Sequence, residues 1–386
     1  MKRIENPYRP GFNEPPKELA GREVVLEDLR DAIEVAAIDG RMPRPTLLVG
    51  ARGVGKTVLL GEAAAIAGSR FGWPRLHVEM RPDTPFTPDL IGAARRTSRL
   101  LEQPAPKLGL KTESVTVRAG VPGIGGEIRF ARAGDAEEDP TPALRAALTQ
   151  LAELAGERES GVVMTLDEAH LAERKELAAL AALLQEGTGE QWPMVVVLAG
   201  LPLMRAAEHS VTYLERGAWH ELGLLNSLES VQALRRPAEE AGRPMDDDAA
   251  RMLAQASGGY PYAIQLYGHH AWRASTGRER IDLDAVETAL PRAQGELERG
   301  LYAARWTAAS PQQRRYLAAV ATVAATGHPV TARAVADEIG RTTKQLSSVR
   351  DDLIKQGTLT VDGTQLRFTI PGMSVFVLAA QSADTA

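Results

Sequence analysis

Residues 50–57 have the types and the spacing that a phosphate-binding loop requires. They fit the pattern G-x-x-x-x-G-K-[ST] at every fixed position. Glycines let the backbone turn so that successive amides point inward, and a helix that begins after the loop adds partial positive charge. Lys56 would reach the terminal phosphates and Thr57 a magnesium ion. The predicted contacts of ATP and Mg²⁺ are Gly50, Ala51, Arg52, Gly53, Val54, Gly55, Lys56, Thr57 and Val58.

An acidic pair, Asp167 and Glu168, follows a second apolar stretch and offers the other half of such a site. Asp167 can hold Mg²⁺ together with Thr57, through the water shell of the ion, while Glu168 orients and activates the attacking water. A solvated turn or a helix start is the alternative for the pair. His170 either couples the site to a partner or simply starts a helix. We predict an ATPase in which Glu168 and Lys56 are catalytic and Thr57 and Asp167 are the metal ligands.

Short apolar strands separated by helices must position these residues. Helices are predicted over 24–33 and 58–67, where apolar residues recur at helical spacing. Thr141 is the predicted cap of a later helix. Strands alternating with helices predict an α/β fold, with a parallel P-loop sheet covered on both faces. The predicted strands are 45–49, 75–80, 161–166 and 194–199.

Beyond residue 222 the sequence pattern becomes helical and indicates a small lid. Ser227 and Asp246 have the types of helix caps, the glycines at 258–259 are expected to end one helix, and Pro261 is expected to begin another. We therefore predict an N-terminal arm and P-loop core over 1–222, followed by a helical lid over 223–300.

The last part of the chain, residues 301–386, has the pattern of a winged-helix domain. Three predicted helices precede two short β-strands that are joined at an Asp-Gly turn. The helices are expected at 311–325, 331–339 and 343–356, and the strands at 358–361 and 364–368.

The composition is that of an ordinary globular protein and excludes several functional classes. A length of 386 residues allows two or three domains, and a net charge of −5 argues against a protein that coats nucleic acid. The absence of cysteine excludes disulfides, thiolate metal sites and thiol catalysis. The first ten residues lack an apolar segment, and no later run approaches membrane-spanning length. We expect a cytoplasmic protein without a membrane partner.

An insertion at about 105–140 is unexpected in a minimal nucleotide-binding core. Its two stretches with strand character, 114–120 and 127–132, flank a Gly/Pro turn and predict a β-hairpin. Several basic residues lie in or near it, so it either contacts a nucleic acid or a neighbouring subunit, or is a surface hairpin whose charge nearby acidic residues dilute.

DNA contacts are predicted at the start of the helix over 343–356. Its apolar residues share one face, which leaves polar residues near the exposed N-terminal end, where a recognition helix touches bases. Residues 326–386 hold six Lys or Arg and six Asp or Glu, so non-specific attraction to DNA is weak. Winged helices also serve as protein-docking modules. The candidate DNA contacts are Arg341, Thr342, Lys344, Gln345, Ser348 and Arg367.

On these residues the chain resembles the AAA+ superfamily, and within it the origin-recognition initiator ATPases and the related STAND signalling ATPases. The resemblance covers residues from about 15 to 386. Besides the two nucleotide motifs and the winged helix, it rests on Gly-Arg-Glu at 21–23, Tyr-Leu-Glu-Arg at 213–216, Trp-His-Glu-Leu at 219–222 and Gly-Gly-Tyr-Pro at 258–261.

The resemblance implies an AAA+ type core and lid that hold adenine between them. Leu19 and Ala20 would contact the base from the core side, and Gly259 and Pro261 from the lid. Arg216 matches the position of an arginine finger or sensor that acts on the γ-phosphate of this chain or of a neighbour. A surface ion pair is the alternative for Arg216.

Two departures from the family pattern bear on hydrolysis. Residues 199–202, which follow the fourth strand, are Ala-Gly-Leu-Pro and offer no polar sensor of the γ-phosphate. The lid motif lacks the arginine of initiator-type ATPases and has Tyr260 and Tyr262 instead. The expected behaviour is slow hydrolysis by a nucleotide-state switch that opens and closes lid against core.

Two main functions follow from this interpretation, and a third alternative is a DNA-binding regulator that merely retains ATP. One is an ATP-dependent AAA+ switch whose winged helix engages DNA. The other is a STAND-like signalling or defence ATPase that self-associates on binding ATP, with the winged helix packed on the core. A nucleotide-dependent homo-oligomer or a protein partner is compatible with both.

Overall fold

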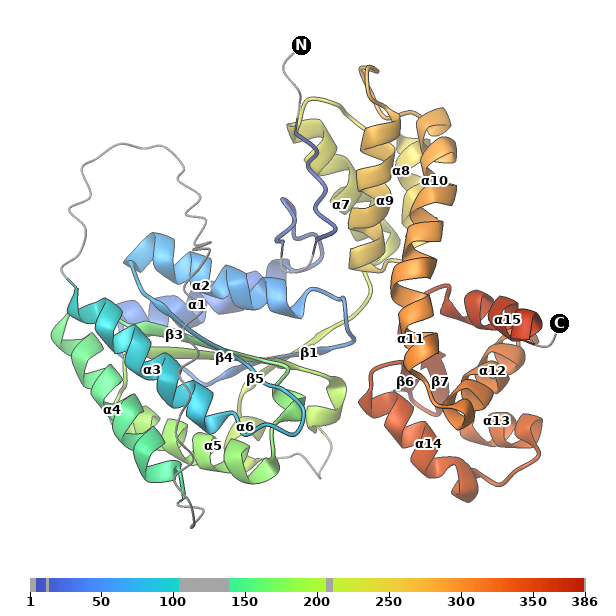
Figure 1. Cartoon of the computed structure of the whole chain (residues 1–386). Coiled ribbons are helices and arrows are strands. Elements are labelled where there is room, and N and C mark those ends of the chain that lie inside the picture. The colour runs from blue at the N-terminus through green and yellow to red at the C-terminus, as the bar shows by residue number, and fades with distance from the viewer. Residues whose placement is uncertain (1–4, 12–13, 104–138, 206–210, 385–386) are drawn as a thin grey trace, which may run out of the picture.

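A parallel sheet forms the centre of the larger half of the molecule. The computed structural model describes residues 5–11, 14–103, 139–205 and 211–384. Within these ranges the sheet has five parallel strands in the order β2-β3-β4-β1-β5 (Figure 1). Because the strands are parallel, their carboxyl ends meet at one edge, where open α/β sheets bind ligands. The strands are β1 (Thr46–Gly50), β2 (Arg75–Glu79), β3 (Val162–Asp167), β4 (Met194–Gly200) and β5 (Ala218–Leu222).

Two helical layers cover the sheet, and each encloses its own apolar cluster. Leu48, Val163 and Val197 point into the layer of α1 and α2. Met164 and Val196 point into the layer of α3, α4 and α5, which lies on the opposite face (Figure 1). The core helices are α1 (Glu23–Ile38), α2 (Lys56–Phe71), α3 (Thr87–Glu102), α4 (Thr141–Glu157) and α5 (Arg174–Gly189), with short segments η1 (Ala169–Leu171), η2 (Pro202–Arg205) and α6 (Thr212–Glu215).

The predicted parallel sheet with helices on both faces is confirmed, and the differences are local. The strand β5 was not predicted, because an edge strand of partly exposed residues lacks a continuous apolar run. The prediction that Thr141 caps a helix is wrong, since it lies inside α4 and donates its hydroxyl to the Asp139 carboxylate (2.6 Å). Asn226, rather than Ser227, caps the first lid helix, in a reciprocal capping box with Glu229.

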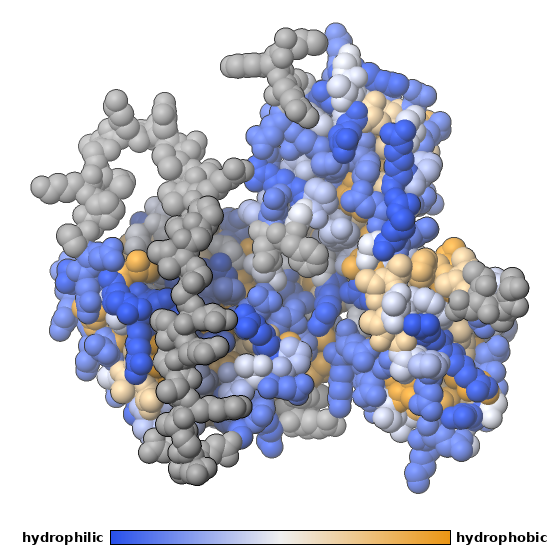
Figure 2. Space-filling model, in the orientation of Figure 1, coloured by the Kyte–Doolittle hydropathy of each residue, from blue (hydrophilic) through white to orange (hydrophobic). Residues whose placement is uncertain are grey.

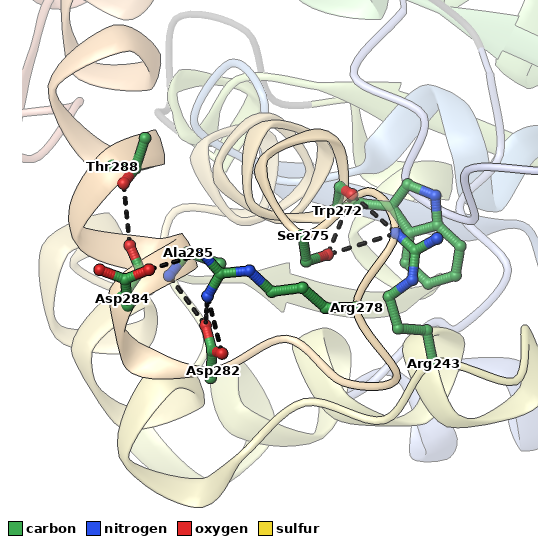
Figure 3. A network of polar contacts seen from close by, with 8 residues as sticks. All are labelled: Arg243, Trp272, Ser275, Arg278, Asp282, Asp284, Ala285 and Thr288. Atoms are coloured by element: carbon green, nitrogen blue, oxygen red, sulfur yellow. Dashed lines mark hydrogen bonds and ion pairs between the residues drawn. The ribbon is translucent and has the colours of Figure 1, made fainter.

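The lid is a group of four helices, in which Arg243 ties two segments together. Its guanidinium lies 4.3 Å from the centre of the Trp272 ring and donates to the Trp272 carbonyl (2.9 Å) and the Ser275 hydroxyl (3.3 Å) (Figure 3). This cation–π contact and the hydrogen bonds fix the loop before α8 on the end of α9. The lid helices are α7 (Ser227–Glu240), α8 (Asp247–Ser257), α9 (Pro261–Ala274) and α10 (Leu283–Leu297).

A second arginine organises the start of α10. Arg278 donates to both carboxylate oxygens of Asp282 (2.6 and 2.7 Å) and to Asp284 (2.6 Å) (Figure 3). Asp282 is the N-cap residue and accepts from the amide of Ala285 (2.9 Å). The lid therefore enters α10 through a fully hydrogen-bonded turn.

The N-terminal arm crosses from the core to the lid. The Tyr8 side chain is 2% exposed, packs on Gly268 of α9 and donates its hydroxyl to the Leu234 carbonyl of α7. An added Cβ at Gly268 would lie 2.4 Å from the Tyr8 ring, so this position has no room for a side chain. The arm amide of Arg9 also donates to Gln265 (3.0 Å). The arm is therefore fastened to the lid at residues 8–9.

A rod-like helical segment leads from the lid to the C-terminal domain. The end of α10 continues through a π-helical turn, η3 (Glu298–Tyr302), into α11 (Ala303–Ala308) (Figure 1). Beyond it, three helices and an antiparallel hairpin are consistent with a winged-helix domain. Figure 2 shows apolar colour gathered over this domain. Its elements are α12 (Pro311–Ala325), α13 (Ala332–Ile339), α14 (Thr343–Lys355), β6 (Leu359–Asp362), β7 (Gln365–Phe368) and α15 (Met373–Asp384), the last of which was not predicted.

The apolar interior of the C-terminal domain is continuous with that of the lid, because both contribute to one buried cluster. None of the helices in the described ranges has the length and apolar character needed to cross a membrane. The predicted hairpin over 114–120 and 127–132 lies outside the described residues.

Candidate functional site

The loop over 50–57 joins β1 to α2 at the carboxyl edge of the sheet. Gly53 and Gly55 have φ values of 79° and 99°, in the region that favours glycine. Gly55 is the N-cap of α2 and has no side chain to cap the helix, so the first amides of α2 remain available to an anion. The loop thus has the backbone geometry of an anion cradle.

Lys56 is the charged group of this cradle. It is 6% exposed, and its ammonium donates to the carbonyls of Gly50 (2.9 Å) and Ala51 (2.7 Å). Burial lowers the Lys56 pKa to about 8, although Glu168 and Asp167 act in the opposite direction. A bound phosphate would restore the charged form by supplying a closer anion.

Thr57 and Asp167 come together from opposite sides of the site. The Thr57 hydroxyl at the start of α2 donates to Oδ2 of Asp167 at the end of β3 (2.6 Å), and Oδ1 of Asp167 accepts from the Glu168 amide (2.8 Å). A hydroxyl and one carboxylate, completed by phosphate oxygens and water, form the oxygen-rich set that suits Mg²⁺. In the described part of the chain no cluster of three His, Asp or Glu could hold a metal by itself.

Glu168 occupies a strained position beside the loop. Its φ is 52°, unusual for a residue with a side chain and frequent at functional sites. Burial raises the pKa of its carboxyl, while Arg52 and Lys56 lower it. Its Oε2 lies 3.9 Å from the Arg52 guanidinium and 3.4 Å from Nε2 of His170. The carboxylate is therefore held near the loop with a basic neighbour on either side.

His170 connects the acidic pair to the end of β4. Besides the contact with Glu168, its Nδ1 accepts a hydrogen bond from the Leu201 amide (3.4 Å). Residues 199–202 supply no polar side chain here, as the sequence indicates. The imidazole of His170 is consequently the polar group that links this strand end to Glu168.

The segment predicted to contact adenine bridges the core and the lid. Leu19 packs with the α1 and α2 cluster, whereas Ala20 belongs to the lid cluster. Arg22, which the sequence analysis used only as part of the Gly-Arg-Glu motif, donates to the carbonyls of Val54 (3.2 Å) and Gly223 (2.8 Å). Arg22 therefore ties the phosphate loop to the link between β5 and the lid.

The lid approaches the loop through Tyr260, which the sequence analysis placed in the lid motif without predicting a contact with the loop. Its hydroxyl donates to the Arg52 carbonyl (3.2 Å), and an added Cβ at Gly53 would lie 2.0 Å from that hydroxyl. Gly259 is equally constrained, because its added Cβ would lie 2.0 Å from the Leu225 carbonyl oxygen. Pro261 starts α9 next to them, as predicted. Gly53 thus permits close contact between loop and lid, and Gly259 permits close contact between the start of α9 and the segment that leads into α7.

Arg216 lies away from this assembly within the same chain. It is exposed and precedes β5, whose first residue Ala218 pairs with Thr46 at the amino end of β1. The phosphate loop follows the opposite end of β1, about 13 Å away along four strand residues. The structure therefore does not bring Arg216 to the phosphates of its own chain, and a role toward a neighbouring chain stays a prediction.

The candidate DNA contacts gather around the start of α14, apart from Arg367 on β7. Thr342 and Gln345 form a reciprocal capping box, in which the Thr342 hydroxyl accepts from the Gln345 amide (3.4 Å) and Oε1 of Gln345 from the Thr342 amide (3.0 Å). Arg367 lies 3.2 Å from the Asp362 carboxylate. The remaining exposed candidates at this helix start are Arg341, Lys344 and Ser348.

Comparisons with known proteins agree with this geometry. Residues 18–197 match the AAA ATPase domain family, and residues 299–377 match a family described as a domain of unknown function. Among solved structures, the chain is similar to the Orc2 protein of Aeropyrum pernix in ADPNP-ADP complexes, with a TM-score of 0.61 and 14% identity over 97% of this chain and 98% of that one. Among curated proteins none matches significantly.

Two further structures share the fold. The Walker-type ATPase paby2304 of Pyrococcus abyssi has a TM-score of 0.59 and 16% identity, over 94% of this chain and 97% of that chain. Cdc6p of Pyrobaculum aerophilum has a TM-score of 0.50 and 16% identity, over 97% of each chain. At such identities the likeness establishes the fold, which is that of the Orc and Cdc6 type of AAA+ ATPase.

Proposed function

We propose that the chain, whose residues 18–197 match the AAA ATPase domain family, binds ATP with Mg²⁺ and hydrolyses it slowly as a molecular switch. The observation that carries the proposal is the 2.6 Å hydrogen bond between Thr57 and Asp167. It joins the two oxygen ligands that a nucleotide-bound Mg²⁺ requires, directly beside the buried ammonium of Lys56.

Each residue of the site has a separate task in this proposal. The amides of residues 53–57 and the Lys56 ammonium bind the phosphates, while Thr57 and Asp167 hold Mg²⁺, which neutralises charge developing on the phosphoryl oxygens. Glu168 orients the attacking water and accepts its proton. The raised pKa of Glu168 favours such proton transfer, because a carboxylate with a higher pKa is a stronger base.

Titration calorimetry with ATP and Mg²⁺ tests the proposal. Saturable binding is expected for the wild-type chain, and Lys56→Ala should weaken it about 10- to 100-fold, because charge-assisted hydrogen bonds to phosphate are lost. Lys175→Ala removes an exposed lysine on α5 and serves as the control. Absence of saturable binding by the wild-type chain would contradict the proposal.

For the C-terminal domain, we propose that the start of α14 engages DNA in a nucleotide-dependent manner. Arg341 and Lys344 are exposed there, beside Ser348. Fluorescence anisotropy with labelled duplex DNA should give different affinities in the apo, ADP and ATP states. Equal affinities in the three states would contradict coupling of DNA binding to the nucleotide.

One contact favours a second candidate function, a STAND-like ATPase that self-associates. The C-terminal domain packs on the core, since an added Cβ at Gly357 would lie 3.8 Å from Cγ of Arg52 and 3.5 Å from the Leu201 side chain. Light scattering with a non-hydrolysable ATP analogue distinguishes the two functions. An analogue-dependent oligomer without DNA binding supports the second and contradicts the first.

A further inference from the structure

Three parts of the chain meet at the phosphate loop. Tyr260 of the lid bonds to the Arg52 carbonyl, and Gly357 of the C-terminal domain faces the Arg52 side chain. The lid and the C-terminal domain also touch each other, because an added Cβ at Gly258 would lie 2.7 Å from Pro371. A conformational change of the phosphate loop would therefore alter its direct contacts with both the lid and the C-terminal domain.

Arg305 lies within this junction. It belongs to α11, the last part of the helical rod that leads out of the lid (Figure 1). The side chain is half-buried, and its electrostatic neighbours are the Tyr260 hydroxyl and the Arg52 guanidinium. Burial is the main reason that the Arg305 pKa is lowered, and repulsion from Arg52 adds to it. In the ranges that the structure describes, no carboxylate forms an ion pair with Arg305.

The junction is consequently short of negative charge. Arg52 has the Glu168 carboxylate at 3.9 Å, whereas Arg305 has a neutral phenol and a second cation. Both electrostatic neighbours of this half-buried guanidinium belong to the junction, because Arg52 lies in the phosphate loop and the Tyr260 hydroxyl donates to the Arg52 carbonyl. A guanidinium there is suited to an anion with several oxygens, which its planar fork of donors can bind in a bidentate manner. The terminal phosphate of a nucleotide on the loop is the anion that this arrangement fits.

We propose that Arg305 binds the terminal phosphate of a nucleoside triphosphate held by the loop, and that this contact fastens the C-terminal domain to the core. The inference rests on the proposed function, because it needs a nucleotide on the loop. The phosphate then determines whether the C-terminal domain stays docked.

Paired nucleotides isolate the terminal phosphate in a binding experiment. Arg305→Ala should weaken binding of a non-hydrolysable ATP analogue about 10- to 100-fold and change ADP binding less than about twofold. Arg299→Ala, which removes an exposed arginine of the same rod, is the matched control and should change neither. Arg305→Lys keeps the charge without the fork and should recover part of the loss.

The outcomes separate the two proposals. If the wild-type chain binds neither nucleotide, the proposed function fails and this inference fails with it. If the wild-type chain binds both but Arg305→Ala behaves like Arg299→Ala, or loses ADP and analogue equally, only the inference is overturned. Circular dichroism of each variant excludes unfolding as the cause of a loss.

A distance measurement tests the docking step itself. Because the chain contains no cysteine, Ala65→Cys on α2 and Glu338→Cys on α13, both exposed, give a single labelled pair across the junction. With saturating ATP analogue, the Arg305→Ala background should show a longer or broader distance distribution than the Arg299→Ala background. Identical distributions in the two backgrounds would overturn the docking role.

Discussion

The helices α2 and α14 both begin with polar residues, but they treat their first amides in opposite ways. Gly55 starts α2 without a side chain, so its amides stay open toward the loop. Thr342 and Gln345 start α14 with a reciprocal box that satisfies amides internally. The first arrangement is suited to bind an anion through the backbone, whereas the second leaves recognition to exposed side chains. The two helix starts differ in whether their first backbone amides are open to a ligand, as in α2, or bonded to a side chain of the same helix start, as in α14.

The largest effect is expected at the acidic pair beside α2. Glu168→Gln removes the proton acceptor without changing shape, so ATP turnover should fall about 10²- to 10⁴-fold while ATP binding stays. A phosphate-release assay and calorimetry on the same preparation measure the two properties. Unchanged turnover would show that Glu168 is not the base.

The pH dependence of nucleotide binding tests the role of the Lys56 charge at the start of α2. The Lys56 pKa of about 8 means that raising the pH from 7 to 9 removes most of its charge in the free protein. Binding of ATP with Mg²⁺ should therefore weaken about tenfold over this interval, and the loss lies on the alkaline side because a lysine is neutral above its pKa. In Lys56→Arg, whose side chain stays charged, this alkaline loss should disappear. A flat profile for the wild-type chain would be the contrary result.

At α14, by contrast with α2, the side chain that caps the helix is expected to contribute to stability. Thr342→Ala removes the side-chain acceptor and should lower the free energy of unfolding by about 1 kcal/mol. Urea denaturation gives this value, and Thr343→Ala, which lies one residue inside the helix, is the control. A loss in the control as large as in Thr342→Ala would mean that the box does not stabilise the helix.

The smallest effect is expected for an exposed side chain at the same helix start. Lys344→Ala should weaken DNA binding a few-fold and reduce the slope of log affinity against log salt by about 1, because one phosphate contact is lost. Anisotropy at several salt concentrations measures the slope. Lys355→Ala at the far end of α14 should leave it unchanged, and equal effects of both variants would exclude a specific role for the helix start.

The parts of the fold that follow from local patterns were predictable from the sequence. Apolar runs predicted β1, β3 and β4, alternation of apolar and polar residues predicted β2, and glycine and proline correctly marked where α8 ends and α9 begins. The phosphate loop and Asp167 were predicted to share a site, and the structure has them in contact. Hydrolysis and the role of each residue remain predictions.

The approach of Tyr260 and Arg305 to the phosphate loop could not be predicted in this way. Tyr260 meets Arg52 across 208 residues, and Arg305 of α11 is an electrostatic neighbour of both. Their residue types are ordinary for a lid and a linker helix. The hydrogen bond to Arg52 and the close approach that Gly53 allows show in the structure that Tyr260 touches the loop.

The packing of Tyr8 against the lid has a practical consequence for experiments that measure domain motion with a label. Because that phenol is seated between α7 and α9, a dye or spin label attached near residue 5 would travel with the lid rather than with the sheet. A label near the N-terminus would thus report rotation of the lid, which lies more than two hundred residues later in the sequence.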